Sequence, residues 1–242
     1  AEAFYNLGNI FKKMNQREEA LLSFENAGLI NPKMDFILGD ILTAKMNCCE
    51  WNNFDIQVKN LTEKINNNYR VVDPFNLLGI IDNPSIQYRA SLIFSNHSYP
   101  QKKSFLRTKS YKSHAKIRIG YFATDFHNHP GMHLMTELFE NHDKNKFELI
   151  AFSFGPDKND TWRQRVSKSF DQFIDVRTQT DQEIAALSRE LEIDIAINRG
   201  GYTQDCRPKI FAESCAPIQV SYLGYPGTMG AEFMDYLIAD RT

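Results

Sequence analysis

The chain has 242 residues, of which 42% are apolar and 24% are charged, as in an ordinary globular protein with one large or two modest domains. Its formal net charge of −2 argues against a dedicated nucleic-acid binder, which would need an excess of Lys and Arg for phosphate contacts. No signal peptide opens the sequence, and no run of about 18 apolar residues predicts a membrane span.

The cysteines form no Cys-x-x-Cys pair, so a zinc site built on thiolates is not expected. We expect buried thiols in a reducing compartment, the cytoplasm. The four residues are Cys48, Cys49, Cys206 and Cys215. Because the first residue is Ala1 and not Met, the sequence is expected to begin inside a longer protein.

The first 34 residues have the spacing of a tetratricopeptide repeat, a helix-turn-helix unit of about 34 residues. Phe4, Leu7 and Phe11 should share one face of the first helix, and Gly8 and Ala20 should let the two helices approach closely. One hairpin cannot bury both of its faces, so further repeats are expected upstream. A generic helical hairpin is the alternative. The full pattern is Phe4, Leu7, Gly8, Phe11, Ala20, Phe24, Ala27 and Pro32.

Residues 35–114 are expected to form a helical connecting region. Residues 34–42 and 58–65 have amphipathic helical spacing, and Asn83 should cap a helix that begins at Pro84. Within and just beyond this region, residues 101–118 carry seven basic residues and no acid. They are expected to be a solvated linker, with an anion-contacting strip as the alternative.

Residues 115–242 alternate β-rich and helical segments. Asp160 should cap one helix, and Thr180 with Glu183 forms a capping box that opens another. Strands that alternate with helices of this length predict a parallel sheet covered on both faces, a Rossmann-like lobe. The expected strands are 117–123, 147–154, 173–176, 193–197, 218–223 and 236–239.

Three loops that follow expected strands are rich in polar residues or glycine: 124–130, 198–203 and 224–230. Since ligands of such sheets collect beyond the carboxyl ends of the strands, we expect the three loops to meet at one edge. The glycines Gly224, Gly227 and Gly230 lack dinucleotide or P-loop spacing. They favour either a plain turn or a wall of a sugar pocket.

The first of these loops contains Asp125, His127 and His129, with His133 close behind. A histidine positioned by a carboxylate can take a proton from a hydroxyl near neutral pH. The same residues could ligate a metal, or they could hold the loop and cap the following helix. Spacing alone leaves these three interpretations open.

Several segments together resemble the amino-terminal catalytic lobe of the O-GlcNAc transferases, with the bacterial SPINDLY-like relatives more similar than the animal ones. The likeness covers nearly the whole chain in the family's order. Residues 49–51 and 73–75 are similar to the helical segment that the family places between its repeats and this lobe. The lobe segments are 119–130, 201–203, 216–228 and 233–236.

The resemblance implies the first half of a GT-B glycosyltransferase that is inverting, independent of metal and without a cofactor. Such an enzyme would transfer a sugar to Ser or Thr of proteins, and we expect the sugar to be GlcNAc from UDP-GlcNAc. Asp125 and His129 match the family's pair that faces the reaction centre and assists proton removal. The residues that match substrate contacts are Tyr202, Thr203, Leu223, Gly224, Pro226, Gly227 and Thr228.

The resemblance also implies that acceptor proteins bind through the repeat region. From the net charge and the lack of a long apolar run, nucleic acid and membrane are not expected as partners. The sequence ends at Thr242, before the family's second lobe, which would hold most of the nucleotide sugar. We therefore expect this fragment alone to have no useful turnover. Two alternatives are kept: the same fold with GDP-fucose as donor, and a non-catalytic repeat adaptor.

Overall fold

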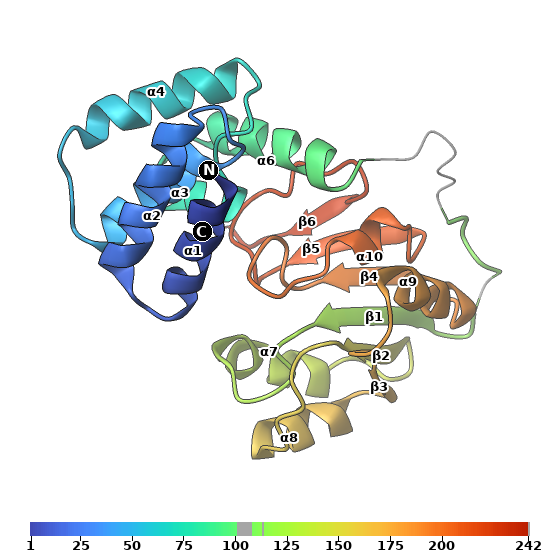
Figure 1. The fold of residues 1–242 in the computed structure, drawn as a ribbon. Helices are drawn as coiled ribbons and strands as arrows, with labels where there is room; N and C mark the ends of the chain where they lie inside the picture. The colour runs from blue at the N-terminus through green and yellow to red at the C-terminus, as the bar shows by residue number, and fades with distance from the viewer. Residues whose placement is uncertain (101–107, 113, 242) are drawn as a thin grey trace. The chain divides into compact units, whose positions relative to one another are not determined.

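The computed structural model describes residues 1–100, 108–112 and 114–241. The chain separates into two compact units (Figure 1). A helical unit comprises Ala1–Ser98 with Gly227–Ala231, and a sheet unit comprises Tyr99–Pro226 with the residues from Glu232 onward. Of the basic stretch at 101–118, residues 101–107 and 113 lie outside the described residues.

The helical unit begins with two antiparallel helices whose contact depends on small side chains. Gly8 faces Phe24, and a Cβ at Gly8 would lie 2.7 Å from that ring. Ala20 is 3% exposed. The predicted close approach at Gly8 and Ala20 is therefore confirmed. The helices of this unit are α1 (Glu2–Lys13), α2 (Arg17–Ile30), α3 (Ile37–Asn47), α4 (Phe54–Asn66), α5 (Pro74–Leu78) and α6 (Pro84–Ser98).

The apolar face expected on α1 differs from the one that packs. Phe4 and Leu7 are 39% and 38% exposed. Tyr5 and Phe11 pack against the buried cluster of α2 and α3 instead. The inner stripe runs at three-residue spacing through Tyr5, Gly8 and Phe11, and this leaves Phe4 and Leu7 at its edge.

Two helix starts in this unit have clear local causes. Asn83 Oδ1 accepts the N–H groups of Ser85 and Ile86 at 3.0 and 3.2 Å, which confirms the predicted cap of α6. Helix α3 begins at Ile37, later than the pattern at 34–42 predicted. Phe36 has a φ of 66°, in the left-handed region, and this conformation cannot continue a right-handed helix.

The sheet unit contains six strands in the order β3-β2-β1-β4-β5-β6, and every neighbouring pair is parallel (Figure 1). All six predicted strands are confirmed, with ends shifted by a residue or two. They are β1 (Ile117–Ala123), β2 (Phe147–Ser153), β3 (Gln172–Asp175), β4 (Ile195–Asn198), β5 (Ile218–Tyr222) and β6 (Tyr236–Ile238).

Helices cover both faces of this sheet, as predicted. One face packs against Met135 of α7 (Pro130–Glu140) and Val166 of α8 (Thr161–Ser169). On the other face, Phe122 of β1 stacks on Phe152 of β2, with ring centroids 4.3 Å apart, and meets Phe211 of α10 (Lys209–Ala212). Alternate residues of each strand thus serve two cores.

The predicted helix caps in this unit are also confirmed. Asp160 Oδ1 accepts the N–H of Arg163 at 2.8 Å at the start of α8. Thr180 and Glu183 form the expected capping box at the start of α9 (Asp181–Glu190). Each cap satisfies helix donors that would otherwise lack partners, and this fixes where the strand-to-helix loops end.

Across the part of the chain that is described, no helix is both long and apolar enough to cross a lipid bilayer. The four cysteines are free thiols. Cys215 is buried as expected and Cys48 and Cys206 are half-buried, but Cys49 is exposed. The expectation of four buried thiols is therefore wrong for Cys49, which follows the end of α3 with a φ of 55°.

We expect Phe152→Ala to lower the free energy of unfolding by about 3–5 kcal/mol, because it removes the ring stacked on Phe122 and leaves a cavity in a buried layer. Phe152→Leu should cost clearly less, since it keeps most of the volume. Urea denaturation followed by circular dichroism measures both changes. Equal losses for the two variants would contradict the packing role given to this ring.

Candidate functional site

Three loops meet at the carboxyl edge of the sheet, as the sequence predicted. Strands β1, β4 and β5 are adjacent and parallel, so the loops after them leave from the same edge. Strand order reverses between β1 and β4, because the chain runs outward to β3 and then returns beside β1. Such a reversal opens a crevice where ligands of parallel sheets bind.

A buried ion pair joins the first two of these loops. Asp125 follows β1 and is 6% exposed, while Arg199 follows β4 directly and is 4% exposed. Arg199 Nε donates to Asp125 Oδ1 at 3.1 Å, and Nη2 donates to Oδ2. The third nitrogen, Nη1, lies 3.1 Å from the Sδ of Met135. The guanidinium therefore forks onto both carboxylate oxygens, the strongest geometry of this pair.

Sequence reasoning did not single out Arg199. It highlighted the loop 198–203 as polar and glycine-rich, but not this side chain. The available signal was a charged residue immediately after a buried strand, at an edge where another expected loop carried an aspartate. Its buried position could be recognised only once β1 and β4 were known to be neighbours.

His129 contacts the same carboxylate. Its Nδ1 lies 2.9 Å from Asp125 Oδ2 and 3.1 Å from the backbone nitrogen of Gly131, at the start of α7. In the tautomer with the proton on Nδ1, this nitrogen donates to the carboxylate and Nε2 keeps its lone pair. The side chain is 46% exposed. Since Nδ1 is turned toward the protein, Nε2 is the nitrogen through which this ring can exchange a proton with a bound hydroxyl. Asp125 and His129 are thus brought together, as the first interpretation of the loop requires.

The other two histidines of the cluster do not join this pair. His133 stacks on Trp162, with ring centroids 4.2 Å apart, and its Nε2 lies 2.8 Å from Asn128 Oδ1. His127 is buried, and its Nδ1 has no hydrogen-bond partner among the described residues. Burial lowers the pKa of His127. No group of three His, Cys, Asp or Glu side chains suited to a metal occurs in residues 1–100, 108–112 and 114–241.

The residues predicted to contact substrate have different surroundings. Tyr202 is buried, with its ring parallel to that of Tyr99 and edge-on to that of Tyr225. Thr203 Oγ1 donates to the carbonyl of Gly200 at 2.8 Å, so this hydroxyl supports its own loop.

The turn after β5 is tight and exposed. Leu223 is 42% exposed and has a φ of 65°, a strained conformation for a residue with a side chain. Gly224 N–H donates to the Tyr222 carbonyl at 2.9 Å and closes the turn. A Cβ at Gly224 would overlap the carbonyl oxygen of Arg199, so only glycine permits this approach of the two loops.

The predicted substrate residues are divided between the two units. Five of the seven, Tyr202, Thr203, Leu223, Gly224 and Pro226, belong to the sheet unit with Asp125 and His129. Gly227 and Thr228 belong to the segment Gly227–Ala231, which packs with the helical unit. Within that segment Gly230 approaches the backbone of α6 closely, at Ser91 and Leu92.

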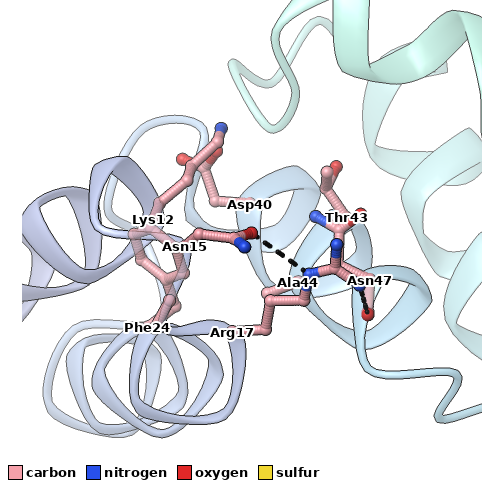
Figure 2. Close-up of a pocket in the computed structure, with 9 residues that line it drawn as sticks. Lys12, Asn15, Arg17, Phe24, Asp40, Thr43, Ala44 and Asn47 are labelled. Carbon is pink, nitrogen blue, oxygen red and sulfur yellow. Dashed lines mark hydrogen bonds between the residues drawn. The ribbon is translucent and has the colours of Figure 1, made fainter.

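The helical unit has a polar cavity of about 140 Å³ among α1, α2 and α3 (Figure 2). Arg17 donates to Asn15 Oδ1 and to the carbonyl of Asn47, both at 3.4 Å, on one side of it. Asp40, on another side, accepts the hydroxyl of Tyr5 at 2.9 Å, and burial raises the pKa of its carboxyl group. None of the predicted site residues lines this cavity.

Gly131→Ala tests how closely the ion pair is packed. Helix propensity alone would make alanine stabilising by about 0.5–1 kcal/mol. A Cβ at Gly131 would collide with the Arg199 guanidinium and lie 2.7 Å from Asp125 Oδ2, so we expect a loss of about 1–3 kcal/mol instead.

The matched control is Gly28→Ala in α2, where the new Cβ would lie 2.9 Å from the flexible end of Ile41 and 3.6 Å from Ile37. That variant should be neutral or stabilising. Thermal unfolding of both variants measures the difference, and stabilisation by Gly131→Ala would contradict the observed packing.

Burial also predicts a pH dependence. Because the pKa of His127 is lowered in the folded chain, the unfolded chain binds a proton near its ordinary pKa of about 6.5 while the folded chain does not. Stability should therefore be fully present above about pH 6.5 and fall as the pH drops below it. His127→Leu should reduce the difference in unfolding free energy between about pH 7.5 and pH 5.5. Parallel pH curves for the variant and the unmodified protein would refute this.

Comparison with known proteins identifies the family. The sequence model of glycosyl transferase family 41 matches residues 48–242. A probable UDP-N-acetylglucosamine–peptide N-acetylglucosaminyltransferase SEC of Arabidopsis thaliana is 42% identical over 126 residues, which are 52% of this chain and 13% of that protein. The corresponding transferase of Caenorhabditis elegans is 38% identical over 126 residues, 52% of this chain and 11% of that protein.

A solved structure shows the same fold. A mutant of the Thermobaculum terrenum O-GlcNAc transferase superposes with a TM-score of 0.68 and 22% identity, over 99% of this chain and 47% of that one. This chain therefore spans less than half the length of that structure and a much smaller share of the curated relatives. The family match begins just after α3 and includes the entire sheet unit, which is well over half of the chain, so the chain belongs to glycosyl transferase family 41.

Proposed function

We propose that the chain is part of a protein O-glycosyltransferase that transfers GlcNAc from UDP-GlcNAc to Ser or Thr. The contact between Asp125 and His129 at the reversal point of the sheet carries the proposal. The names of the similar proteins support the donor and the peptide acceptor. Four free cysteines fit a reducing compartment such as the cytoplasm.

The proposed domain organisation follows from the two kinds of structure. Residues 1–34 form a tetratricopeptide repeat, 35–114 a helical connection, and 115–242 the Rossmann-like first lobe of a GT-B enzyme. The strand order 3-2-1-4-5-6, all parallel, supports the Rossmann-like assignment. The α1–α2 hairpin supports the repeat assignment, and we propose that acceptor proteins bind this helical part.

In the proposed reaction, the acceptor hydroxyl oxygen attacks the anomeric carbon as the bond to the nucleotide diphosphate breaks. The hydroxyl proton passes to Nε2 of His129, whose ring is held through Nδ1 beside Asp125. The diphosphate leaves with its own negative charge. The attack comes from the face opposite the departing diphosphate, so a single displacement inverts the anomeric carbon. We propose that this inverting transfer is independent of metal.

The exposed turn at Leu223, Gly224 and Pro226 is proposed to form a wall of the sugar pocket, with Tyr202 and Thr203 supporting it from the neighbouring loop. Gly227 and Thr228 continue that turn along the chain and are proposed to contact substrate as well. Stabilisation of the leaving diphosphate needs cationic groups beside it, and we propose that a second lobe supplies them. We therefore propose that residues 1–242 alone have no useful turnover.

The test uses the full-length protein with UDP-GlcNAc or GDP-fucose and a library of Ser- and Thr-containing peptides, with products read by mass spectrometry. Asp125→Asn and His129→Ala should each lower kcat by about 10²–10⁴-fold, while calorimetry shows that donor binding persists. Lys168→Ala, which alters an exposed side chain in the last turn of α8 in the sheet unit, is the control and should retain activity.

If transfer occurs from GDP-fucose and not from UDP-GlcNAc, the proposed mechanism stands but the proposed donor is wrong. If neither donor supports transfer and peptides bind tightly, the protein is a non-catalytic adaptor and the proposal of an enzyme is wrong. Full activity of His129→Ala would contradict the proposal that His129 accepts the hydroxyl proton.

A further inference from the structure

We propose that Arg199 is a positioning residue that holds Asp125 in the orientation in which it supports His129. This inference rests on the proposed function for its meaning in catalysis. Arg199, in the loop after β4, and Asp125, in the loop after β1, form a buried ion pair at this edge of the sheet.

Every nitrogen of the Arg199 guanidinium already contacts a protein group. Nε and Nη2 bond to the two oxygens of Asp125, and Nη1 lies against the Sδ of Met135. At 4% exposure the side chain is also shielded from solvent. A diphosphate could reach this guanidinium only by displacing the carboxylate. Arg199 must therefore act through Asp125 and not by direct contact with the donor.

Asp125, in turn, is fixed by this fork. A carboxylate held by one hydrogen bond can rotate about its last torsion, whereas two parallel bonds from one planar guanidinium fix its plane. That plane places Oδ2 at 2.9 Å from His129 Nδ1. Because both oxygens already accept from Arg199, the carboxylate is arranged as a support for the ring, and the ring is the group that receives the proton.

The surroundings leave no substitute for the fork. The backbone of Gly131 passes so close that a Cβ would strike both Arg199 and Asp125. The carbonyl of Arg199 itself is covered by Gly224 of the third loop. A lysine would supply the charge but not two parallel hydrogen bonds, so both the shape and the charge of the guanidinium are needed.

The experiment is a double-mutant cycle in the full-length protein, using Arg199→Met, Asp125→Asn and the double variant, with kcat and donor KM measured for each. Arg199→Met should lower kcat about 10²-fold, the cost of a misplacement near 1 Å, with KM unchanged within about twofold. In the Asp125→Asn background, the same change should cost less than about threefold, because its target is already lost. Arg199→Lys should not restore kcat.

The matched control is another bidentate arginine–carboxylate pair of the sheet unit. Arg165 donates to both oxygens of Glu140 at 2.7 Å, but its side chain is 45% exposed. Arg165→Met should leave kcat and KM unchanged. If the kcat losses of Arg199→Met and Asp125→Asn multiply in the double variant, the two residues act independently and the proposal is overturned. A raised donor KM with unchanged kcat in Arg199→Met would overturn it too.

A second measurement does not depend on activity. In a crystal structure of Arg199→Met, the Asp125 carboxylate should turn away, and the distance from Oδ2 to His129 Nδ1 should exceed hydrogen-bond reach. Retention of the 2.9 Å contact would overturn the inference even if the unmodified protein transferred no sugar. Should Arg199→Met fail to fold, Arg199→Gln offers an uncharged hydrogen-bonding replacement for the same measurement.

Discussion

Arg199 and Asp125 form an ion pair almost wholly shielded from water, where the loops after β1 and β4 meet. Taking two charges out of water is unfavourable, and such a pair often adds little net stability compared with apolar residues. Its effect is geometric. The fork fixes one carboxylate, the carboxylate lies beside His129, and the Arg199 carbonyl is covered by Gly224 of the third loop.

The fold explains why this pair can exist. A parallel sheet whose strand order reverses between β1 and β4 brings the carboxyl ends of these two strands side by side, although 74 residues separate Asp125 from Arg199. Glycines at 131 and 224 make room where a side chain would collide. Helix α7 begins at Pro130, so His129 is its N-cap residue and the ring lies at the first turn. Sheet topology, small residues and a helix start thus converge on one exposed imidazole.

Much of this arrangement could be predicted from the sequence, because the signals are local. Alternating apolar segments gave the six strands, and Asp160 and the Thr180 capping box gave helix starts. The meeting of three loops follows from strands being parallel. The burial of Arg199 and its pairing with Asp125 could not be predicted, because an arginine in a glycine-rich loop is usually exposed. Only the pairing of β4 with β1 brings the two residues together. The left-handed backbone of Phe36 and Leu223 likewise depends on tertiary contacts that no local preference signals.

The central claim, that one buried pair holds the functional edge together, is tested most directly by amide hydrogen exchange in unmodified and Arg199→Met protein, followed by mass spectrometry. The account predicts faster exchange in the Arg199→Met protein for the loops at 124–131, 199–206 and 223–226, while β2 and α8 keep their protection, because only contacts at the edge are lost. Unchanged exchange in these loops, or a uniform increase across the whole sheet unit, would contradict it.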